Sequence, residues 1–289
     1  MPCPVFQHEH IIQLQNSSIA LPGIAQDPVF TQILYSLPPI SLPDVGRVSL
    51  MNRTDTKFFF DANLLPHLLQ NTDSAYFALD MNGLRCIPYQ SLYYDTPNFD
   101  LYLHHHNGKQ NRYKLRYRRY TNTDTSFFEV KQKNNKGRTI KTRTQSDNIK
   151  SQLDQPAVQL LEQQTGSAPA LFEPVLWINY FRTTLVAQNF SERVTIDLGL
   201  HFHAPHKSVY WEHVCIVEVK QDAAFKHSRI SEALKQFHIL PQSLSKYCVG
   251  MAATYQNIKQ NQFKAKLLQI EKIELAHAAN HSYSANTNI

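Results

Sequence analysis

Residues 111–120 read NRYKLRYRRY, followed by SFFEVKQK at residues 126–133 and RTIKTRT at residues 138–144. Side chains on a β-strand alternate between its two faces, so Arg112, Lys114, Arg116 and Arg118 share one face while Tyr113, Leu115 and Tyr117 share the other. The next two runs repeat this division. Polar segments at residues 121–125 and 134–137 separate the runs. The pattern predicts three consecutive antiparallel strands with one ionic face.

Further strand signals lie toward the C-terminus. Residues 175–186, 193–202 and 209–220 are rich in β-branched and aromatic side chains, and Glu218 and Lys220 alternate with valines. We therefore expect roughly eight strands, with one side of the sheet ionic across most of them.

Turn and helix signals complete the pattern. Asn82-Gly83 separates two strand-like runs and predicts a hairpin, because both central residues of such a turn need positive φ. Helices are expected at residues 61–70, 156–164 and 228–238, with a longer one at residues 256–275.

Charge is unevenly spread over the 289 residues. The net charge is +6, yet residues 109–143 carry 12 basic and 2 acidic groups, while residues 1–100 carry 4 and 9. The natural partner of such a segment is a polyanion, and charge alone leaves nucleic acid, an anionic membrane and a phosphate compound open. The hydrophobic content of 42% and the 8 glycines exclude collagen-like, low-complexity and wholly disordered chains.

The ionic face is better explained by a bound anion than by solvent. A face in water would accommodate charges, but it usually mixes signs, because like charges ~7 Å apart repel by roughly 2 kcal/mol at an effective dielectric near 20. If about eight strands close into a barrel, this face lines a basic tunnel and helices pack outside.

Bare phosphate suits this face better than nucleic acid. Tyr113, Tyr117 and Phe128 lie on the opposite face from the cations, so they are not available to stack on bases. Glu218 is an isolated carboxylate among the cations, and a carboxylate together with phosphate oxygens can hold Mg²⁺ or Mn²⁺.

The remaining parts of the chain carry less information. Residues 1–46 are rich in proline and are expected to form an irregular arm, residues 47–276 a single domain, and residues 277–289 a disordered tail. There is no run of 18 apolar residues and no secretory signal at residues 1–10, and the four scattered cysteines are interpreted as reduced thiols. A cytoplasmic location is expected.

Nine segments, taken in order, resemble the VTC domain. This domain is the catalytic module of the vacuolar transporter chaperone complex and a member of the triphosphate tunnel metalloenzyme (CYTH-like) superfamily. The segments are RTDTKFFF (53–60), SLYYDT (91–96), KLRYRRY (114–120), FEVKQK (128–133), IKTR (140–143), YFR (180–182), ERVTID (192–197), VEVK (217–220) and SKY (245–247). The resemblance covers about residues 47–255.

The resemblance implies an α+β fold with a closed antiparallel tunnel that binds ATP, another triphosphate or inorganic polyphosphate with Mn²⁺ or Mg²⁺. Polymerising members transfer the γ-phosphate of ATP to a growing polyphosphate chain. Catalytic positions by this resemblance are Lys57, Arg116, Arg118, Lys131, Arg193 and Lys246. Further phosphate-binding positions are Arg112, Lys114, Lys133, Lys141, Arg182 and Ser245, with Glu218 as the metal ligand and Arg143 supporting the wall.

One departure bears on the reaction. The hydrolytic branch of the superfamily begins with a strand reading ExExK, whereas this chain has RTDTK at residues 53–57. A polymerase is therefore favoured over a tunnel triphosphatase or a non-catalytic polyphosphate- or RNA-binding module. The phosphate-sensing helical domain and membrane region of the eukaryotic complex have no counterpart here, so translocation would need a separate membrane partner, with the chain peripheral to the membrane.

Two groups of polar residues are given structural roles. The consecutive histidines 104–106 cannot all face one ion and are expected in an exposed polar turn. Asp95 and Tyr102 are expected to make structural hydrogen bonds.

Overall fold

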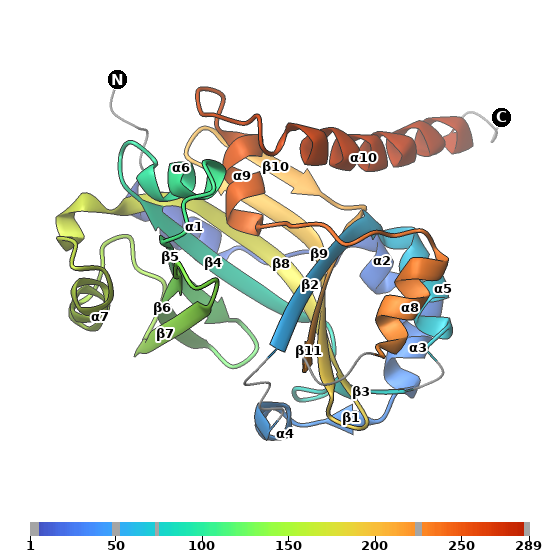
Figure 1. The fold of residues 1–289 in the computed structure, drawn as a ribbon. Coiled ribbons are helices and arrows are strands. Elements are labelled where there is room, and N and C mark those ends of the chain that lie inside the picture. Colours follow the sequence, from blue (N-terminus) through green and yellow to red (C-terminus); the bar gives the residue numbers. More distant parts are fainter. Residues whose placement is uncertain (1–5, 48–52, 73–74, 223–226, 286–289) are drawn as a thin grey trace.

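The computed structural model describes residues 6–47, 53–72, 75–222 and 227–285, which form a large twisted sheet surrounded by helices (Figure 1). Along the main path each strand is antiparallel to its neighbours. The order is β2 (Arg53–Asp61), β11 (Val214–Asp222), β9 (Glu192–Ala204), β8 (Glu173–Ala187), β4 (Ile87–Asp95), β5 (Arg112–Tyr120), β6 (Thr125–Lys133) and β7 (Thr139–Ser146). The short strands β1 (Pro39–Ile40), β3 (Tyr76–Leu79) and β10 (Lys207–Trp211) pair beside this path.

The expected α+β class is confirmed, and the main path has the eight strands predicted. The three consecutive strands predicted around residues 111–144 are β5, β6 and β7. Closure is not strict, because in the described part of the chain β2 pairs only with β11 and β7 only with β6.

The sheet nevertheless curls strongly. Six strand spacings of ~4.8 Å would place β2 roughly 29 Å from β6 in a flat sheet, well beyond the reach of screened charges. Lys57 of β2 is nevertheless close enough to Lys131 of β6 and to Lys114 of β5 to lower the pKa of both. The sheet therefore wraps around its ionic side, which we call the inner face.

Helices cover the outer face. Leu115, Tyr117 and Phe128 are fully buried on this face in one apolar cluster with residues of α7 (Gln155–Thr165). A second outer cluster joins β2, β9 and β11 to α3 (Pro28–Ser36), α5 (Leu65–Gln70) and α8 (Arg229–Gln236). Apolar residues therefore face outward on these strands, as the alternation predicts.

One end of the inner face is filled by α9 (Lys246–Thr254), which packs against β8 and β9 together with α6 (Asp100–His106). Gly250 allows the close approach, because a Cβ there would lie 2.4 Å from the Phe202 ring and 2.8 Å from the Leu176 side chain. The N-terminus of α9 is thus fixed at the border between this apolar plug and the charged part of the inner face.

The N-terminal arm is not irregular, which corrects the prediction. It contains α1 (His8–Asn16), α2 (Gly23–Gln26), α3 and α4 (Leu42–Arg47). Prolines start these helices instead of breaking them: Pro28 lies in the first turn of α3, and the Asp27 carboxylate caps that turn by accepting from the Phe30 amide at 2.8 Å. Phe30, Leu34 and Leu14 are buried against the sheet.

The predicted Asn82-Gly83 turn exists, with φ of 57° and 82°, and it closes one antiparallel bridge between Met81 and Leu84, but the hairpin does not extend beyond that bridge. Strands β3 and β4 do not pair with each other; both run antiparallel along the same side of β8. The turn lies on a loop between them. Arg85 anchors that loop by donating to the Leu34 carbonyl at 2.8 Å and by pairing with Asp80 at 3.1 Å.

The last helix begins and ends later than predicted. It is α10 (Lys264–Ala285), so the tail expected to be disordered is helical up to residue 285, and residues 286–289 lie outside the described part. His277 fixes the helix by donating from Nε2 to Asp61 at 2.8 Å. The other three predicted helices are present as the turn Ala62–Leu64 with α5, α7 and α8.

The three histidines lie in the last turn of α6, not in an exposed turn as predicted. His106 is buried, and the His105 ring lies against the Tyr113 carbonyl at 3.2 Å. Asp95 has the structural role predicted, because it accepts from the amides of Leu101 and Tyr102 at 2.8 and 2.9 Å and so begins α6.

Candidate functional site

Three carboxylates of the inner face are each held between two cations. Glu218 of β11 lies between Lys57 of β2 and Lys220 of its own strand. Burial alone would raise the pKa of Glu218, but the two ammonium groups hold it well below its usual range. Glu218 is therefore an anion that joins two strands.

Glu129 of β6 makes the second such group. It accepts from Arg116 Nε and Nη2 at 2.8 and 2.6 Å and from Lys141 Nζ at 2.8 Å. Its side chain is only 1% exposed, and burial would raise its pKa, yet Arg116 and its neighbouring cations hold the pKa well below the usual range.

Asp197 of β9 makes the third. It accepts from Arg182 Nε and Nη2 at 2.6 and 2.7 Å and also from Lys246, the first residue of α9. Opposing its burial, Arg182 and Lys246 lower the pKa of Asp197 to about 2. The charged part of the inner face is thus tied together from β2 across to β7 and to α9.

Cations outnumber acids around these groups and form a row across three strands. Lys114 lies directly opposite Lys131, which lies directly opposite Lys141. Like charges in opposite positions destabilise a sheet. Lys141 relieves this by reaching to Glu129, and Lys114 donates to Ser245 Oγ at 2.8 Å. Lys131 has neither an ion-pair nor a hydrogen-bond partner among the described residues.

Lys131 is exposed to water and yet enclosed by charged protein groups, as expected in the wall of a cavity. Burial contributes most to lowering its pKa to about 7, and Lys114, Arg116 and Lys57 lower it further while Glu218 opposes them. An anion placed among these groups would remove the repulsion.

Two arginines are oriented by tyrosines. Arg116 donates to the Tyr93 hydroxyl at 2.7 Å, and Arg118 donates to the Tyr180 hydroxyl at 2.8 Å. The Tyr180 ring also lies 5.0 Å from Lys246 Nζ. Both guanidinium groups are thereby held on the inner face.

The structure brings together most of the residues predicted for the site. Through the contacts above it joins Lys57, Lys114, Arg116, Arg118, Lys131, Lys141, Arg182, Glu218, Ser245 and Lys246. Arg193 lies opposite Lys220 in the β9–β11 register. Arg112 and Lys133 form the next row toward one end of the sheet, and the Arg143 guanidinium stacks over the Phe127 ring at 4.3 Å.

Sequence reasoning did not assign the two carboxylates Glu129 and Asp197, or Tyr93, Tyr180 and Lys220, to the site. Strand alternation places Glu129, Asp197 and Lys220 on the ionic face, but it does not say which cation each contacts. The partners depend on the curl of the sheet.

The carboxylates present were tested as ligands for the Mn²⁺ or Mg²⁺ that the resemblance implies. No group of three His, Cys, Asp or Glu in the described part of the chain could hold a metal ion by itself. Glu218 offers carboxylate oxygens in contact with two ammonium groups, and Mg²⁺ is commonly bound by one or two carboxylates plus phosphate oxygens. Glu218 therefore fits a metal ion that arrives with a phosphate ligand.

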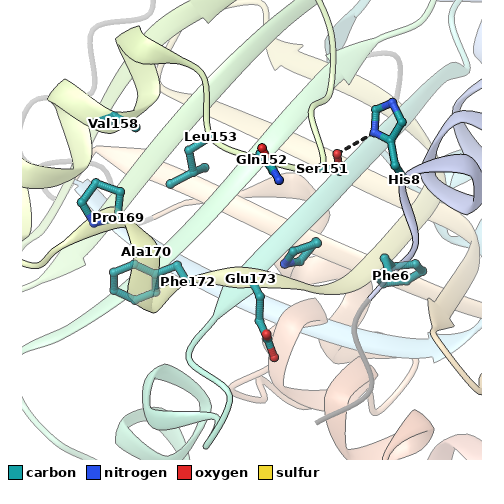
Figure 2. A pocket seen from close by; sticks show the side chains of 11 residues that line it. Phe6, His8, Ser151, Gln152, Leu153, Val158, Pro169, Ala170, Phe172 and Glu173 are labelled. Atoms are coloured by element: carbon teal, nitrogen blue, oxygen red, sulfur yellow. Dashed lines mark hydrogen bonds between the residues drawn. The ribbon is translucent and has the colours of Figure 1, made fainter. Parts of the chain in front are cut away.

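A separate pocket of ≈ 460 Å³ lies away from this face (Figure 2). Its walls include Phe6, Leu153 and Phe172, with His8 bonded to Ser151 at 2.7 Å. Because no lysine or arginine lines it, this pocket does not suit a phosphate ligand. Within the described residues, no helix is long and apolar enough to cross a membrane.

Comparison with known proteins gives one family. The family model of the VTC domain matches residues 52–255. No curated protein sequence matches the chain.

Similarity to solved structures is weak. A candidate adenylyl cyclase from Hippeastrum, described as having a dominant triphosphatase activity, is 13% identical, with a TM-score of 0.44, and the match covers 70% of this chain and 97% of that one. A candidate adenylate cyclase from Bacillus halodurans is 13% identical with a TM-score of 0.41, over 67% and 94% of the two chains. A Pyrococcus horikoshii protein, PH1819, is 11% identical with a TM-score of 0.35, over 74% and 98%.

Proposed function

The chain belongs to the VTC domain family, and from this premise we propose that it is a metal-dependent polyphosphate polymerase. It transfers the γ-phosphate of ATP to the end of a growing inorganic polyphosphate chain on its inner face. The observation that carries the proposal is the row Lys114, Lys131 and Lys141, three cations directly opposite one another.

The charge balance of the inner face supports a phosphate ligand. Four carboxylates, Asp55, Glu129, Asp197 and Glu218, lie among ten basic side chains, which are Lys57, Lys114, Arg116, Arg118, Lys131, Lys141, Arg182, Arg193, Lys220 and Lys246. A polyphosphate chain carries many negative oxygens and no bases. The rings on this face are not free to stack on bases, because Tyr93 and Tyr180 are buried and Phe127 is covered by Arg143. The face therefore suits phosphate oxygens better than nucleobases.

To catalyse phosphoryl transfer, a protein mainly has to align the reactants and place cations around the transferred group. Arg116 and Arg118 are oriented by tyrosines and can each direct two N–H groups to phosphate oxygens. Lys57 and Lys246 belong to other elements of the inner face, Lys57 to β2 and Lys246 to the start of α9. Charge on the phosphates is thereby neutralised by residues of several elements.

Reaction in the proposed direction needs no covalent enzyme intermediate. A terminal oxygen of the polyphosphate chain attacks the γ-phosphorus, the bond to the bridging oxygen of ADP breaks, and ADP leaves with the electron pair. Glu218 would hold the divalent metal, which supplies charge neutralisation and orients the phosphate oxygens. Lys57 and Lys220, released from Glu218, are then free to contact phosphate.

The same cations would also serve a triphosphatase, in which water replaces the chain end as the attacking group. The polymerase is favoured because β2 reads RTDTK where the hydrolytic branch has ExExK, so that Arg53 stands in place of the first glutamate. We propose a cytoplasmic protein, with any transport of the product left to a separate membrane partner.

The test is to incubate the purified protein with Mn²⁺ and ATP and to follow polyphosphate on a gel together with free orthophosphate. Long anionic product that needs the metal supports the polymerase. Orthophosphate alone would show a triphosphatase, and the absence of both products despite tripolyphosphate binding would show a binding module. An Arg116→Ala preparation controls for contaminating kinases.

A further inference from the structure

The basic character of the inner face continues beyond the site to one end of the sheet. Arg112 and Lys133 lie opposite each other, two residues beyond Lys114 and Lys131, a step of ~7 Å along the strands. Beyond Arg112 and Lys133, the turn between β6 and β7 carries two exposed cations, Lys136 and Arg138. A fifth cation, Lys109, lies just before β5. We call these five residues the basic edge: Lys109, Arg112, Lys133, Lys136 and Arg138.

The turn that carries Lys136 and Arg138 is well ordered by its own hydrogen bonds. Asn134 Oδ1 accepts from the amides of Lys136 and Arg138 at 3.1 and 3.0 Å, and the Asn134 amide donates to the Arg138 carbonyl at 2.9 Å. Gly137 takes the positive φ of 75° that this geometry needs. The two cations therefore have a fixed place beside Lys133.

The basic edge lacks the compensation found in the site. In the site each of three carboxylates is held between two cations, whereas no ion pair to the basic edge occurs among the described residues. There is also no acidic residue between Asp100 and Asp124, or between Glu129 and Asp147. The contacts it does make are to neutral groups: Arg112 donates to the Lys109 carbonyl at 2.6 Å, and Lys109 lies 3.2 Å from His104 Nε2.

We propose that the basic edge holds the part of a long, linear inorganic polyphosphate that extends out of the site, so that the protein binds long chains more tightly than tripolyphosphate. This inference rests on the proposed function, because it needs phosphate in the site. Three observations support it: the edge continues the Lys114–Lys131 row, it lies at one end of the sheet where β5 begins and β6 turns into β7, and its cations have no acidic partners among the described residues. Single-stranded RNA is disfavoured, since none of the five residues is aromatic.

Three residues of the edge lie outside the site and can be changed without touching it. The test variant combines Lys109→Gln, Lys136→Gln and Arg138→Gln. The matched control removes the same number of charges from α10 with Lys264→Gln, Lys266→Gln and Lys272→Gln. Affinities for tripolyphosphate, long-chain polyphosphate and a single-stranded RNA homopolymer are measured by titration at several salt concentrations.

For wild type and control, long-chain polyphosphate should bind more tightly than tripolyphosphate and with a steeper salt dependence. In the test variant, affinity for long chains should fall about tenfold, with a shallower salt dependence, while affinity for tripolyphosphate is unchanged. In the polymerisation assay, the variant should make shorter product at an unchanged initial rate.

The outcomes separate this inference from the proposed function. Normal tripolyphosphate binding with no preference for long chains would overturn the basic edge and leave the site intact. Absence of tripolyphosphate binding in wild type would overturn both. RNA that binds as tightly as long polyphosphate, and is lost equally in the variant, would make the edge a nucleic-acid surface instead.

Discussion

Lys114 of β5 lies directly opposite Lys131 of β6, on the inner face of a curled sheet. The arrangement is unfavourable in the free protein, because two ammonium groups face each other with Lys57 and Arg116 close by. It becomes favourable only when negative charge enters between them. The relationship therefore links the stability of the free protein to the binding of an anion, and it can be tested in both states.

The first prediction concerns pH. With a folded-state pKa of about 7 against an ordinary value of 10.5, Lys131 binds fewer protons folded than unfolded between these values. The stability of the free protein should therefore rise with pH over that window, whereas tripolyphosphate affinity should fall, because the anion needs Lys131 charged. Urea unfolding and titration calorimetry from pH 6 to 9 measure the two trends. In the Lys131→Gln variant, the stability and the tripolyphosphate affinity should both depend less steeply on pH. Slopes equal to those of the wild type would show that other groups cause the two pH dependences.

The second prediction concerns occupancy. An anion that binds only the folded state raises the melting temperature. Tripolyphosphate at about 100 times its Kd should add ~2.7 kcal/mol of stability. For a chain of 289 residues that corresponds to roughly 4–5 °C. Thermal unfolding with tripolyphosphate, with sulfate and with sodium chloride at matched ionic strength provides the measurement. No shift at saturation would remove the argument that an anion compensates the inner face.

Sequence alone could predict the two faces of the sheet, because side-chain alternation depends only on the strand itself. That period of two predicts that Leu115 and Phe128 face outward and that Lys114 and Lys131 face inward. The ion pairs could not be predicted, since Lys57 contacts Glu218 only in the observed register of β2 with β11. Which cations meet on the inner face likewise depends on the curl of the whole sheet.

Two further differences have tertiary causes. Asn82-Gly83 gives a correct local turn, but the flanking strands pair with β8 because Arg85 fixes the loop to α3. The alanines around His277 favour a helix, but the small polar residues that follow them predict disorder. Its bond to Asp61, more than two hundred residues away, ties this part of α10 to the end of β2.

The third prediction concerns the attachment of α9 to the sheet. Tyr247 of α9 donates its hydroxyl to Asp95, which is fully buried at the end of β4. Tyr247→Phe should lower the free energy of unfolding by about 1–3 kcal/mol, because a buried acceptor loses a partner. Urea unfolding measures the loss. A variant as stable as wild type would show that the Asp95 backbone contacts suffice.

The same pair gives a pH dependence of opposite sign to that of Lys131. Burial raises the pKa of Asp95 from 3.8 to about 6, so the folded state binds more protons than the unfolded state between these values, and this contribution to stability is lost as pH rises through that window. The Tyr247 hydroxyl lowers the pKa of Asp95. In Tyr247→Phe this pKa should therefore rise, so that the loss of stability with increasing pH continues above pH 6.

The fourth prediction separates an enclosed site from an open surface. Lys131→Glu places a carboxylate in the row between Lys114 and Lys141, and Lys150→Glu makes the same change away from the inner face, beside Asp147. The first should abolish tripolyphosphate binding and leave weak, salt-sensitive duplex binding by peripheral cations nearly unchanged. Filter binding with both ligands distinguishes the cases. Equal loss of both ligands in Lys131→Glu would place this residue on an open surface and favour a nucleic-acid-binding role.

The last prediction concerns the metal. Glu218 and Glu129 are both carboxylates held between two cations, with side chains 16% and 1% exposed, so the two variants can be compared directly. If Glu218 holds the metal, Glu218→Gln should abolish Mn²⁺-dependent turnover while tripolyphosphate still binds without metal, because the variant removes a negative charge from the site. Glu129→Gln removes the same charge and should keep a turnover that responds to Mn²⁺. Circular dichroism and metal titrations on both variants, with and without tripolyphosphate, separate loss of fold from loss of the metal. Turnover in Glu218→Gln that keeps the wild-type dependence on Mn²⁺ would sink the assignment of Glu218, and loss of metal dependence in Glu129→Gln alone would move the metal to Glu129.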